Sequence, residues 1–321
     1  MPQPTRSDVH VNAPLTQISI AFLQDMSGFV ARKAFPSLPV KKQSDRYYVY
    51  DKKQWFRSDA RIRAPGTESA GSGFTVDNTP SYYCDVRAVH KDVDDGMREN
   101  ADAVIDPDRD ATEFVTRDLA LEAELDWAAT YFTTGIWTGS TTGTDVTPST
   151  KWDAASSTPI EEMRAQIRSV QAKTGFKANT AVLAPNVWDV LQDHPDFLDR
   201  IKYTQKGIVT TDLLANVLGL KEVLVAEAIA DAADEGVADN LGFIFSNSVL
   251  LVYSAPRPSL LHPSAGYTFA WTGRFGSNAA GMRIKRFRIE KIESDRVEGQ
   301  SAYDHKLIAP ECGALLLNVL T

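Results

Sequence analysis

The clearest pattern in the chain is a run of apolar residues at helical spacing across residues 110–133. Apolar side chains recur there every three or four residues, which places them along one side of a helix about 35 Å long. Asp110 is followed three residues later by Glu113, a capping-box pattern that predicts where this helix begins. The side predicted to face inward carries Phe114, Leu121, Leu125, Ala128 and Phe132, and is widened by Val115, Leu119, Trp127 and Tyr131.

Two strands are predicted within residues 45–93. The stretch 47–50 reads Tyr-Tyr-Val-Tyr and is rich in residues that favour strands. A second strand, with one apolar and one wet face, is predicted over residues 82–91. Its apolar positions are Cys84, Val86 and Ala88, and its polar positions are Asp85, Arg87 and Lys91.

A long excursion joins these two strands. Its tip, residues 64–73, consists mostly of small residues and glycine, which favour turns, and includes Glu68. The excursion has too few apolar residues for a core of its own, so it is predicted either to be disordered or to be ordered by another molecule. Its flank is basic, with Lys52, Lys53, Arg57, Arg61 and Arg63.

Helices and strands alternate in residues 158–253, after a loop at 134–157 that predicts a boundary between subdomains. A helix is predicted to open at Thr158 with a capping box to Glu161 and a proline at its first position, and to end near Gly175. Further helices are predicted at 187–191 and 211–217, and strands at 180–184, 222–228 and 243–253, which together indicate a mixed α/β layer. Residues 231–239 form a small acidic loop. Residues 282–320 are predicted to return to strands that join the earlier β material.

Composition supports a folded protein and excludes several classes. The 321 residues are 43% hydrophobic and 24% charged, which excludes a disordered or fibrous chain. A net charge of −8 argues against binding nucleic acid through overall charge. The first twelve residues lack the pattern of an export signal, and charged residues interrupt the apolar stretch 18–35, so no membrane span is predicted.

Catalytic and metal-binding motifs are not found, so the sequence predicts neither an enzyme nor a cofactor. Asp106, Asp108 and Asp110 imitate a calcium loop but lack its glycine and its final glutamate. The acids Glu122, Glu124 and Asp126 are explained by the solvated face of the long helix. Packed or exposed roles are also predicted for Cys84, Cys312, His10, His90, His194, His262 and His305.

The basic residues allow three interpretations. Besides the excursion, a second basic cluster consists of Arg283, Lys285, Arg286 and Arg288. These cations could form the polar side of strands, pair with acids of a neighbouring copy, or bind phosphate, which the net charge disfavours. The acids considered as partners are Glu122 and Asp126 of the long helix and Asp92, Asp94 and Asp95.

The order of these segments resembles the major capsid proteins of tailed bacteriophages, which have the Hong Kong 97-like fold. The resemblance covers most of the chain and rests on residues 45–57, 63–70, 100–116, 182–188, 243–253 and 266–271. Residues 182–188 read Val-Leu-Ala-Pro-Asn-Val-Trp, and residues 266–271 read Gly-Tyr-Thr-Phe-Ala-Trp. The evidence is the succession of segments in register, since no single motif among them is highly specific.

The resemblance implies an α+β fold with an N-terminal arm at 1–44, an extended β-hairpin loop at 45–79 and an axial α/β domain at 158–253. A peripheral domain would comprise residues 80–157 and 254–321, with its spine helix at 110–133. The implied function is a shell of pentamers and hexamers around double-stranded DNA. Contacts between subunits would involve Lys52, Lys53, Arg57, Arg61, Arg63, Glu68, Asp94, Asp95, Glu122 and Asp126.

The resemblance also implies partners and a location. The chain would assemble with itself and with a portal, possible decoration proteins and weakly bound DNA, in the host cytoplasm and then the virion, and not with a membrane. Because the loop is reached by residue 45, either a separate scaffolding protein or a short-arm type of capsid protein is expected in place of a long scaffolding segment. The alternatives are an α/β enzyme or ligand-binding module in residues 158–253, and a tail or decoration protein.

Overall fold

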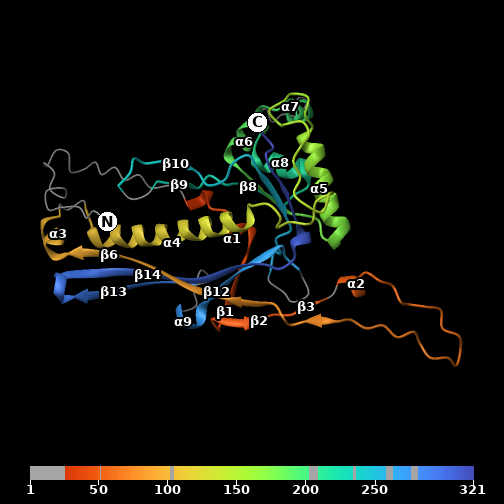
Figure 1. Ribbon diagram of the computed structural model, residues 1–321, viewed down its shortest axis with the longest axis horizontal. Coiled ribbons are helices and arrows are strands. Elements are labelled where there is room, and N and C mark those ends of the chain that lie inside the picture. Colours follow the sequence, from red (N-terminus) through yellow and green to blue (C-terminus); the bar gives the residue numbers. More distant parts are fainter. Residues whose placement is uncertain are drawn as a thin grey trace.

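The computed structural model describes residues 26–50, 52–101, 105–201, 209–233, 236–257, 263–275 and 281–321. The first 25 residues, which include His10, lie outside this description, as does His262. Figure 1 shows a long sheet covered by one helix, a second unit that rises from one end of it, and a loop that projects beyond that end.

The long sheet has five strands, arranged around β14 (Ser294–Leu307). One half of β14 lies between β6 (Asp85–Asp94) and β13 (Met282–Ile289), and its other half pairs with β12 (Gly266–Trp271). All three pairings are antiparallel. Strand β1 (Ser37–Val40) adds to β12 in parallel. A smaller pair, β2 (Ser44–Arg46) with β5 (Ser81–Tyr83), leads toward the loop.

Helix α4 (Pro107–Tyr131) covers this sheet and is the predicted long helix. Its N-cap lies four residues earlier than the capping-box pattern indicated. Asp106 is the N-cap and accepts hydrogen bonds from the backbone N–H groups of Asp108 and Arg109, both at 3.2 Å. Pro107 is well suited to the first helical position because its φ is preset and its missing N–H is not needed there.

The buried side of α4 is rotated from the one predicted. Phe114 is 44% exposed, whereas Val115, Leu119, Trp127 and Tyr131 are buried. These residues are separated by four or eight positions in the sequence, so they form one continuous row along the helix.

After Cys84, the buried and exposed faces of β6 are the reverse of those predicted. Val86 is 39% exposed, and the charged residues Arg87 and Lys91 lie beneath α4. The Arg87 guanidinium lies 4.4 Å from the centre of the Tyr303 ring, and the Lys91 ammonium lies 5.1 Å from that of Phe114. Long basic side chains can cover apolar surface with their stems and stack their charged heads on rings, which alternation alone does not reveal.

Gly299 of β14 allows α4 to approach the sheet closely. A Cβ atom at this position would lie 2.2 Å from Val115 Cγ1 and 2.9 Å from Leu119 Cδ1. We therefore expect Gly299→Ala to destabilise the subunit by about 1–3 kcal/mol, because a packed helix must shift. Urea denaturation measures this change. Gly71→Ala is the matched control, because a Cβ atom there would meet no described atom within 4 Å.

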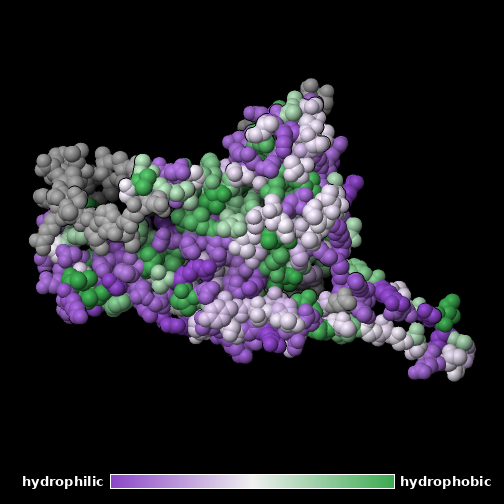
Figure 2. Space-filling view, in the orientation of Figure 1, coloured by the Kyte–Doolittle hydropathy of each residue, from purple (hydrophilic) through white to green (hydrophobic). Residues whose placement is uncertain are grey.

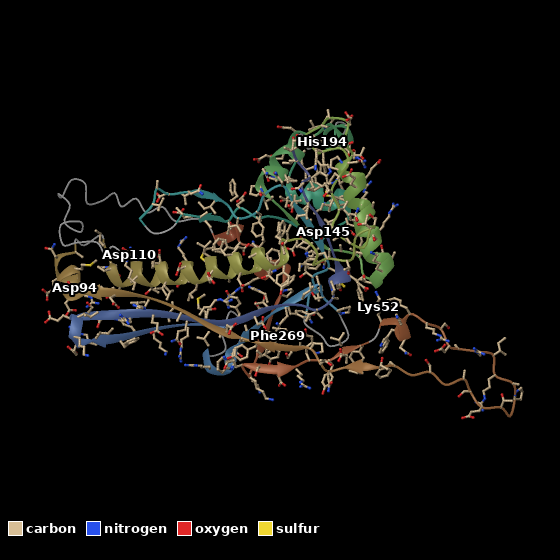
Figure 3. All side chains as sticks on the ribbon, viewed as in Figure 1. Lys52, Asp94, Asp110, Asp145, His194 and Phe269 are labelled. Atoms are coloured by element: carbon tan, nitrogen blue, oxygen red, sulfur yellow. The ribbon has the colours of Figure 1, made fainter. Side chains whose placement is uncertain are left out.

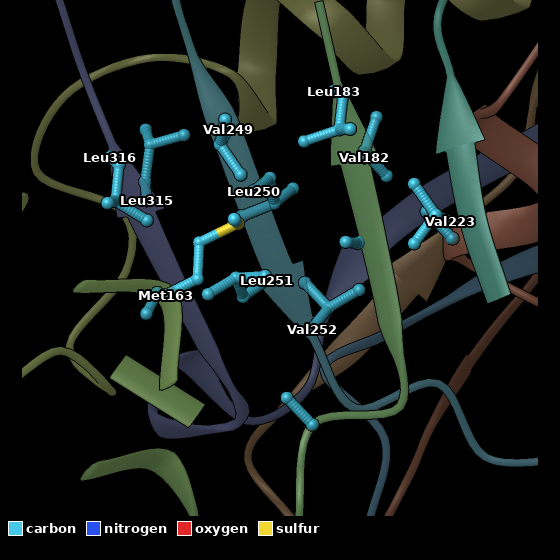
Figure 4. Packing of buried hydrophobic residues seen from close by; sticks show 14 of the residues in the cluster. Met163, Val182, Leu183, Val223, Val249, Leu250, Leu251, Val252, Leu315 and Leu316 are labelled. Atoms are coloured by element: carbon cyan, nitrogen blue, oxygen red, sulfur yellow. The ribbon is translucent and has the colours of Figure 1, made fainter. Parts of the chain in front are cut away.

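The second unit contains a four-stranded sheet in the order β15 (Gly313–Leu316), β11 (Val249–Val252), β7 (Thr180–Leu183) and β8 (Glu222–Val225). Its helices are α5 (Pro159–Thr174), α6 (Pro185–Asp193), α7 (Pro195–Ile201) and α8 (Thr211–Leu218). All residues of β7, β11 and β15 are buried, and Figure 4 shows Met163 of α5 close to Leu250 at the centre. This continuous burial explains why these strands have uniformly apolar sequences.

Three expectations about this unit need correction. The final strand, β15, pairs with β11 here and does not join the long sheet. The loop 134–157 is part of this core, because Trp137 and Trp152 are fully buried in it. Thr158 is the N-cap residue of α5 as predicted, but its side chain makes no capping hydrogen bond, and the Asp196 carboxylate accepts the Ile160 N–H at 3.1 Å.

The remaining elements are short. No helix in the described ranges is both long and apolar enough to cross a bilayer. The short elements are η1 (Met26–Gly28), α1 (Ala31–Ala34), β3 (Val49–Tyr50), α2 (Lys52–Trp55), β4 (Val76–Asp77), α3 (Asp95–Asn100), β9 (Ile229–Asp231), β10 (Leu241–Phe243), α9 (Thr272–Phe275), η2 (Glu290–Ile292) and η3 (Pro310–Cys312).

Candidate contact surfaces

The excursion predicted from the sequence is a loop that extends away from the body. Strands β3 and β4 pair at its base, and the chain then runs out to a turn at Gly66, where φ is +82°, and back. Every described residue from 52 to 79 is exposed except Asp59. Figure 2 shows hydrophilic and hydrophobic residues side by side along it. The loop therefore has no core in its own chain.

Three aromatic rings form an exposed cluster at the base of the loop. The ring centres of Tyr50, Trp55 and Phe74 lie 5.7–6.2 Å apart. Trp55 is nevertheless 57% exposed and Phe74 59% exposed. Aromatic side chains dominate the energetics of protein interfaces, so this cluster is suited to burial by a partner.

The base of the loop is held against the second unit. The Lys52 ammonium pairs with the Glu311 carboxylate and donates to the Lys173 carbonyl at 3.3 Å, at the C-terminal end of α5 (Figure 3). The Phe56 ring packs over Gly175, where a Cβ atom would lie 3.0 Å from it. A cation at the negative end of a helix is favourable, so Lys52 serves as an internal anchor.

The other predicted loop residues are exposed. Arg57 pairs with Asp59 at 2.9 Å, and Arg63 donates to the Thr67 carbonyl at 2.5 Å. Arg61 and Arg63 form no ion pair with any described carboxylate. The remaining members of the predicted set on this loop, Lys53 and Glu68, are likewise exposed.

The acids predicted to meet a neighbouring copy have partners within their own chain. Asp126 and Glu122 of α4 lie 2.9 Å and 3.5 Å from Arg87. Asp94 is the N-cap of α3 and accepts the Met97 N–H. Asp95 receives two hydrogen bonds of 2.6 Å from Arg288.

The second basic cluster belongs to an ion-pair network at the far end of the long sheet. Arg286 bridges Asp108 and Asp295, and Arg98 contacts the same two carboxylates. The pKa of Asp295 is lowered by its hydrogen bond to Arg286. Arg286 and Arg288 of this cluster are thus neutralised within the subunit, which the sequence could not show because their partners are distant in the chain.

Glu124 is a buried carboxylate and not part of a solvated face. It is 2% exposed, and its two oxygens accept the backbone N–H groups of Val30 and Ala31 at 2.8 and 3.0 Å. Burial raises the pKa of this carboxyl. Its place beside the buried row of α4, directly after the buried Ala123, is the signal that could have indicated this role.

His305 is buried where the two units meet. Its Nδ1 lies 2.8 Å from the hydroxyl of Thr268, which donates its own proton to the Phe35 carbonyl at 3.1 Å. The hydroxyl therefore accepts from Nδ1–H, which fixes the tautomer. Burial and the nearby charge of Arg32 lower the pKa of His305 to about 3. Of the other described histidines, His194 bonds Ser157 and His90 is exposed.

The lowered pKa predicts how stability depends on pH. In the unfolded chain a histidine takes up a proton near pH 6.5, whereas folded His305 stays neutral down to about pH 3. The unfolded state therefore binds more protons in this window, and the free energy of unfolding should fall by ~1.4 kcal/mol per pH unit below pH 6.5. Urea denaturation of unassembled subunits between pH 4.5 and 7 tests this. His305→Gln should be less pH-dependent by about one proton, and an unchanged slope would contradict the assignment.

Both cysteines are packed thiols. Cys84 is 0% and Cys312 1% exposed, and burial raises the pKa of each to about 12. The thiolate is the reactive form, so we expect a thiol reagent at pH 8 to label neither in the folded protein and both in urea. Rapid labelling of the folded protein would contradict this packing.

An open hollow of about 290 Å³ lies between α4 and the chain after β10. It is lined mainly by apolar residues, among them Leu125, Phe132 and Phe245. In the described ranges no three histidine, cysteine or acidic side chains come together as metal ligands. The surfaces that stand out are therefore the exposed loop and its aromatic base.

Sequence comparisons point to one family. Residues 139–251 match the family model described as phage major capsid protein E. A major capsid protein of Burkholderia phage BcepMu is 30% identical over 45% of this chain and 46% of its own length, so that match spans about half of each protein. A major capsid protein of Pseudomonas phage JBD67 is 24% identical over 97% of both chains.

Solved structures agree with this assignment at the level of the fold. A phage-related protein from Bordetella bronchiseptica superposes with a TM-score of 0.69 at 21% identity, covering 92% of this chain and 93% of that one. The mature capsid protein of bacteriophage PhiM1 gives a TM-score of 0.61 at 12% identity, covering 97% and 92%. The chain therefore has the Hong Kong 97-like fold of phage capsid proteins, and its sequence is similar to those of phage major capsid proteins.

Proposed function

We propose that the chain assembles with copies of itself into pentamers and hexamers that close into an icosahedral shell around double-stranded DNA. The observation that carries this proposal is the loop at 52–79, which exposes nearly all of its residues and has no core in its own chain. A segment that lacks a core in its own subunit can be ordered by packing on the next one. Copies joined head to tail form rings when the rotation closes.

The domains of the chain would be those that the resemblance implies. Residues 1–44 would be the arm, residues 45–79 the loop, residues 80–157 and 254–321 the peripheral domain, and residues 158–253 the axial domain. Strand β15 pairs inside the axial sheet, so we assign it and the buried loop 134–157 to the axial domain instead. Interfaces of roughly 2,000–5,000 Å² are expected, since several segments would be shared between copies.

The predicted contact residues are not equivalent in this proposal. Arg61 and Arg63 on the loop are the strongest candidates, because they are exposed and form no ion pair within the described chain. Asp94, Asp95, Glu122 and Asp126 already have partners in their own subunit. They would contribute to assembly mainly by keeping the subunit rigid.

Further partners belong to the same proposal. A separate scaffolding protein and a portal would act in the host cytoplasm during assembly, and decoration proteins could bind the finished shell. Contact with DNA would be weak, because a net charge of −8 repels a polyanion. The role is structural and requires no catalytic residue.

Electron microscopy of the purified protein, alone and with co-expressed neighbouring phage proteins, tests this function. Shells or isolated rings are the expected result. Tubes would indicate a tail protein, and monomers or small oligomers under all conditions would favour an enzyme or ligand-binding module. Either outcome would overturn the proposal.

A further inference from the structure

A thin hairpin projects from the second unit on the side opposite the loop. Strands β9 and β10 pair antiparallel, with Ile229 opposite Phe243, and extend over α4 (Figure 1). All residues from 236 to 243 are exposed, with exposed fractions of 66% for Val237, 65% for Leu241 and 56% for Phe243. A two-stranded ribbon is marginally stable alone, and these apolar side chains gain little from staying in water.

The hairpin is strongly acidic. Residues 227–243 contain five carboxylates and no lysine or arginine. The Asp231 carboxylate accepts the backbone N–H groups of Ala233 and Asn240, both at 2.9 Å, and these bonds lower its pKa. Glu227 and Asp239 are exposed. The hairpin therefore presents apolar side chains within a negative field.

The loop has the opposite charge and a similar mixture of side chains. Residues 52–79 contain five lysines and arginines against three carboxylates, together with the exposed rings of Trp55, Phe56 and Phe74. Each arm of the loop has about twelve residues and spans roughly 40 Å when extended.

Within one subunit these two surfaces point in opposite directions (Figure 1). The loop of a copy therefore cannot cover the hairpin of the same copy. In a head-to-tail ring each subunit presents its loop to one neighbour and its hairpin to the other, and opposite charges both steer such an encounter and fix its register.

We propose that in the assembled ring the basic loop of one copy lies against the acidic hairpin, residues 227–243, of the next copy. This inference rests on the proposed assembly and specifies which surface receives the loop. Arg61 and Arg63 would face Glu227 and Asp239, and the apolar side chains of both segments would be buried between the copies. The neighbouring copy would supply the packing partner that this two-stranded hairpin lacks.

Cross-linking in assembled particles tests the contact. In Arg61→Cys/Asp239→Cys the introduced thiols are the exposed ones, because Cys84 and Cys312 are buried. A short bismaleimide added to shells of this variant should give a ladder of covalent oligomers up to pentamers and hexamers. The matched control is Arg61→Cys/Asp193→Cys, in which the second thiol lies on the exposed side of α6. We expect at least tenfold less cross-linking in the control.

Charge reversal provides a second measurement if the cysteine variant assembles poorly. Arg61→Glu/Arg63→Glu should lower shell yield at least tenfold, and adding Glu227→Arg/Asp239→Arg should restore it to within about twofold of wild type. Well-formed shells whose cross-linking equals that of the control, or reversal without rescue, would overturn this contact while leaving the proposed assembly intact. If the wild-type chain forms no shells or rings, the proposed function itself fails.

Discussion

Replacing residues 57–73 by two glycines is expected to abolish shell assembly while the subunit stays folded. The shortened loop would retain the β3–β4 pair, and the remaining ends are close, since the Trp55 and Phe74 rings lie 5.7 Å apart. Only exposed residues and Asp59 would be lost, so the core is untouched. Each subunit would nevertheless lose the segment that reaches its neighbour, and a weakened contact repeated around a ring prevents closure.

Sedimentation velocity and electron microscopy would measure this effect. We expect subunits or small rings in place of shells, with the urea midpoint of the unassembled subunit unchanged within error. A same-length replacement by glycine and serine separates the role of the side chains from that of loop length, and should also fail to assemble. Normal shells from either variant would contradict the role given to the loop.

Phe35→Ala is expected to lower the stability of the subunit, whereas Phe74→Ala is expected to impair assembly. Phe35 is fully buried, and its ring lies 4.8 Å from that of Tyr131, 5.6 Å from that of Trp127 and 6.3 Å from that of Trp137. Removing it should destabilise the subunit by about 3–5 kcal/mol, because a large cavity opens where α4 meets the second unit. Urea denaturation of unassembled subunits gives this value.

Phe74 is the matched control for that change. It is 59% exposed, so Phe74→Ala should alter the free energy of unfolding by about 0.5 kcal/mol or less. Its loss should instead raise the subunit concentration needed for assembly, because the ring is available to a neighbour. If Phe74→Ala destabilises the subunit as much as Phe35→Ala, the loop has a core role within its own chain, and its account as an assembly segment is wrong.

Local patterns predicted the longer helices and the buried strands of the second unit. Helix α5 was marked by a proline at its start and by Gly175, which has a φ of +77° at its end. The apolar runs of β7 and β11 and the glycine after α8 were equally informative. The exposed loop was predicted because residues 52–79, with a glycine-rich tip and few apolar positions, cannot form a core.

Long-range pairing explains what local patterns could not predict. The side of β6 that faces α4 follows from its register with β14, which places Arg87 opposite Ser301 and beneath the helix. The final strand was assigned to the wrong sheet because its apolar sequence fits either one, and its pairing with β11 is set by the buried core around it. Glu124 and the network around Asp295 also depend on partners that are distant in the sequence.

The most direct test of the central claim is a three-dimensional reconstruction of particles formed by this chain. The account predicts a closed shell in which residues 52–79 of each copy lie on the next subunit, with Trp55 and Phe74 covered there. A particle or isolated subunit in which residues 64–73 fold back on their own chain, with no neighbour beneath them, would contradict it.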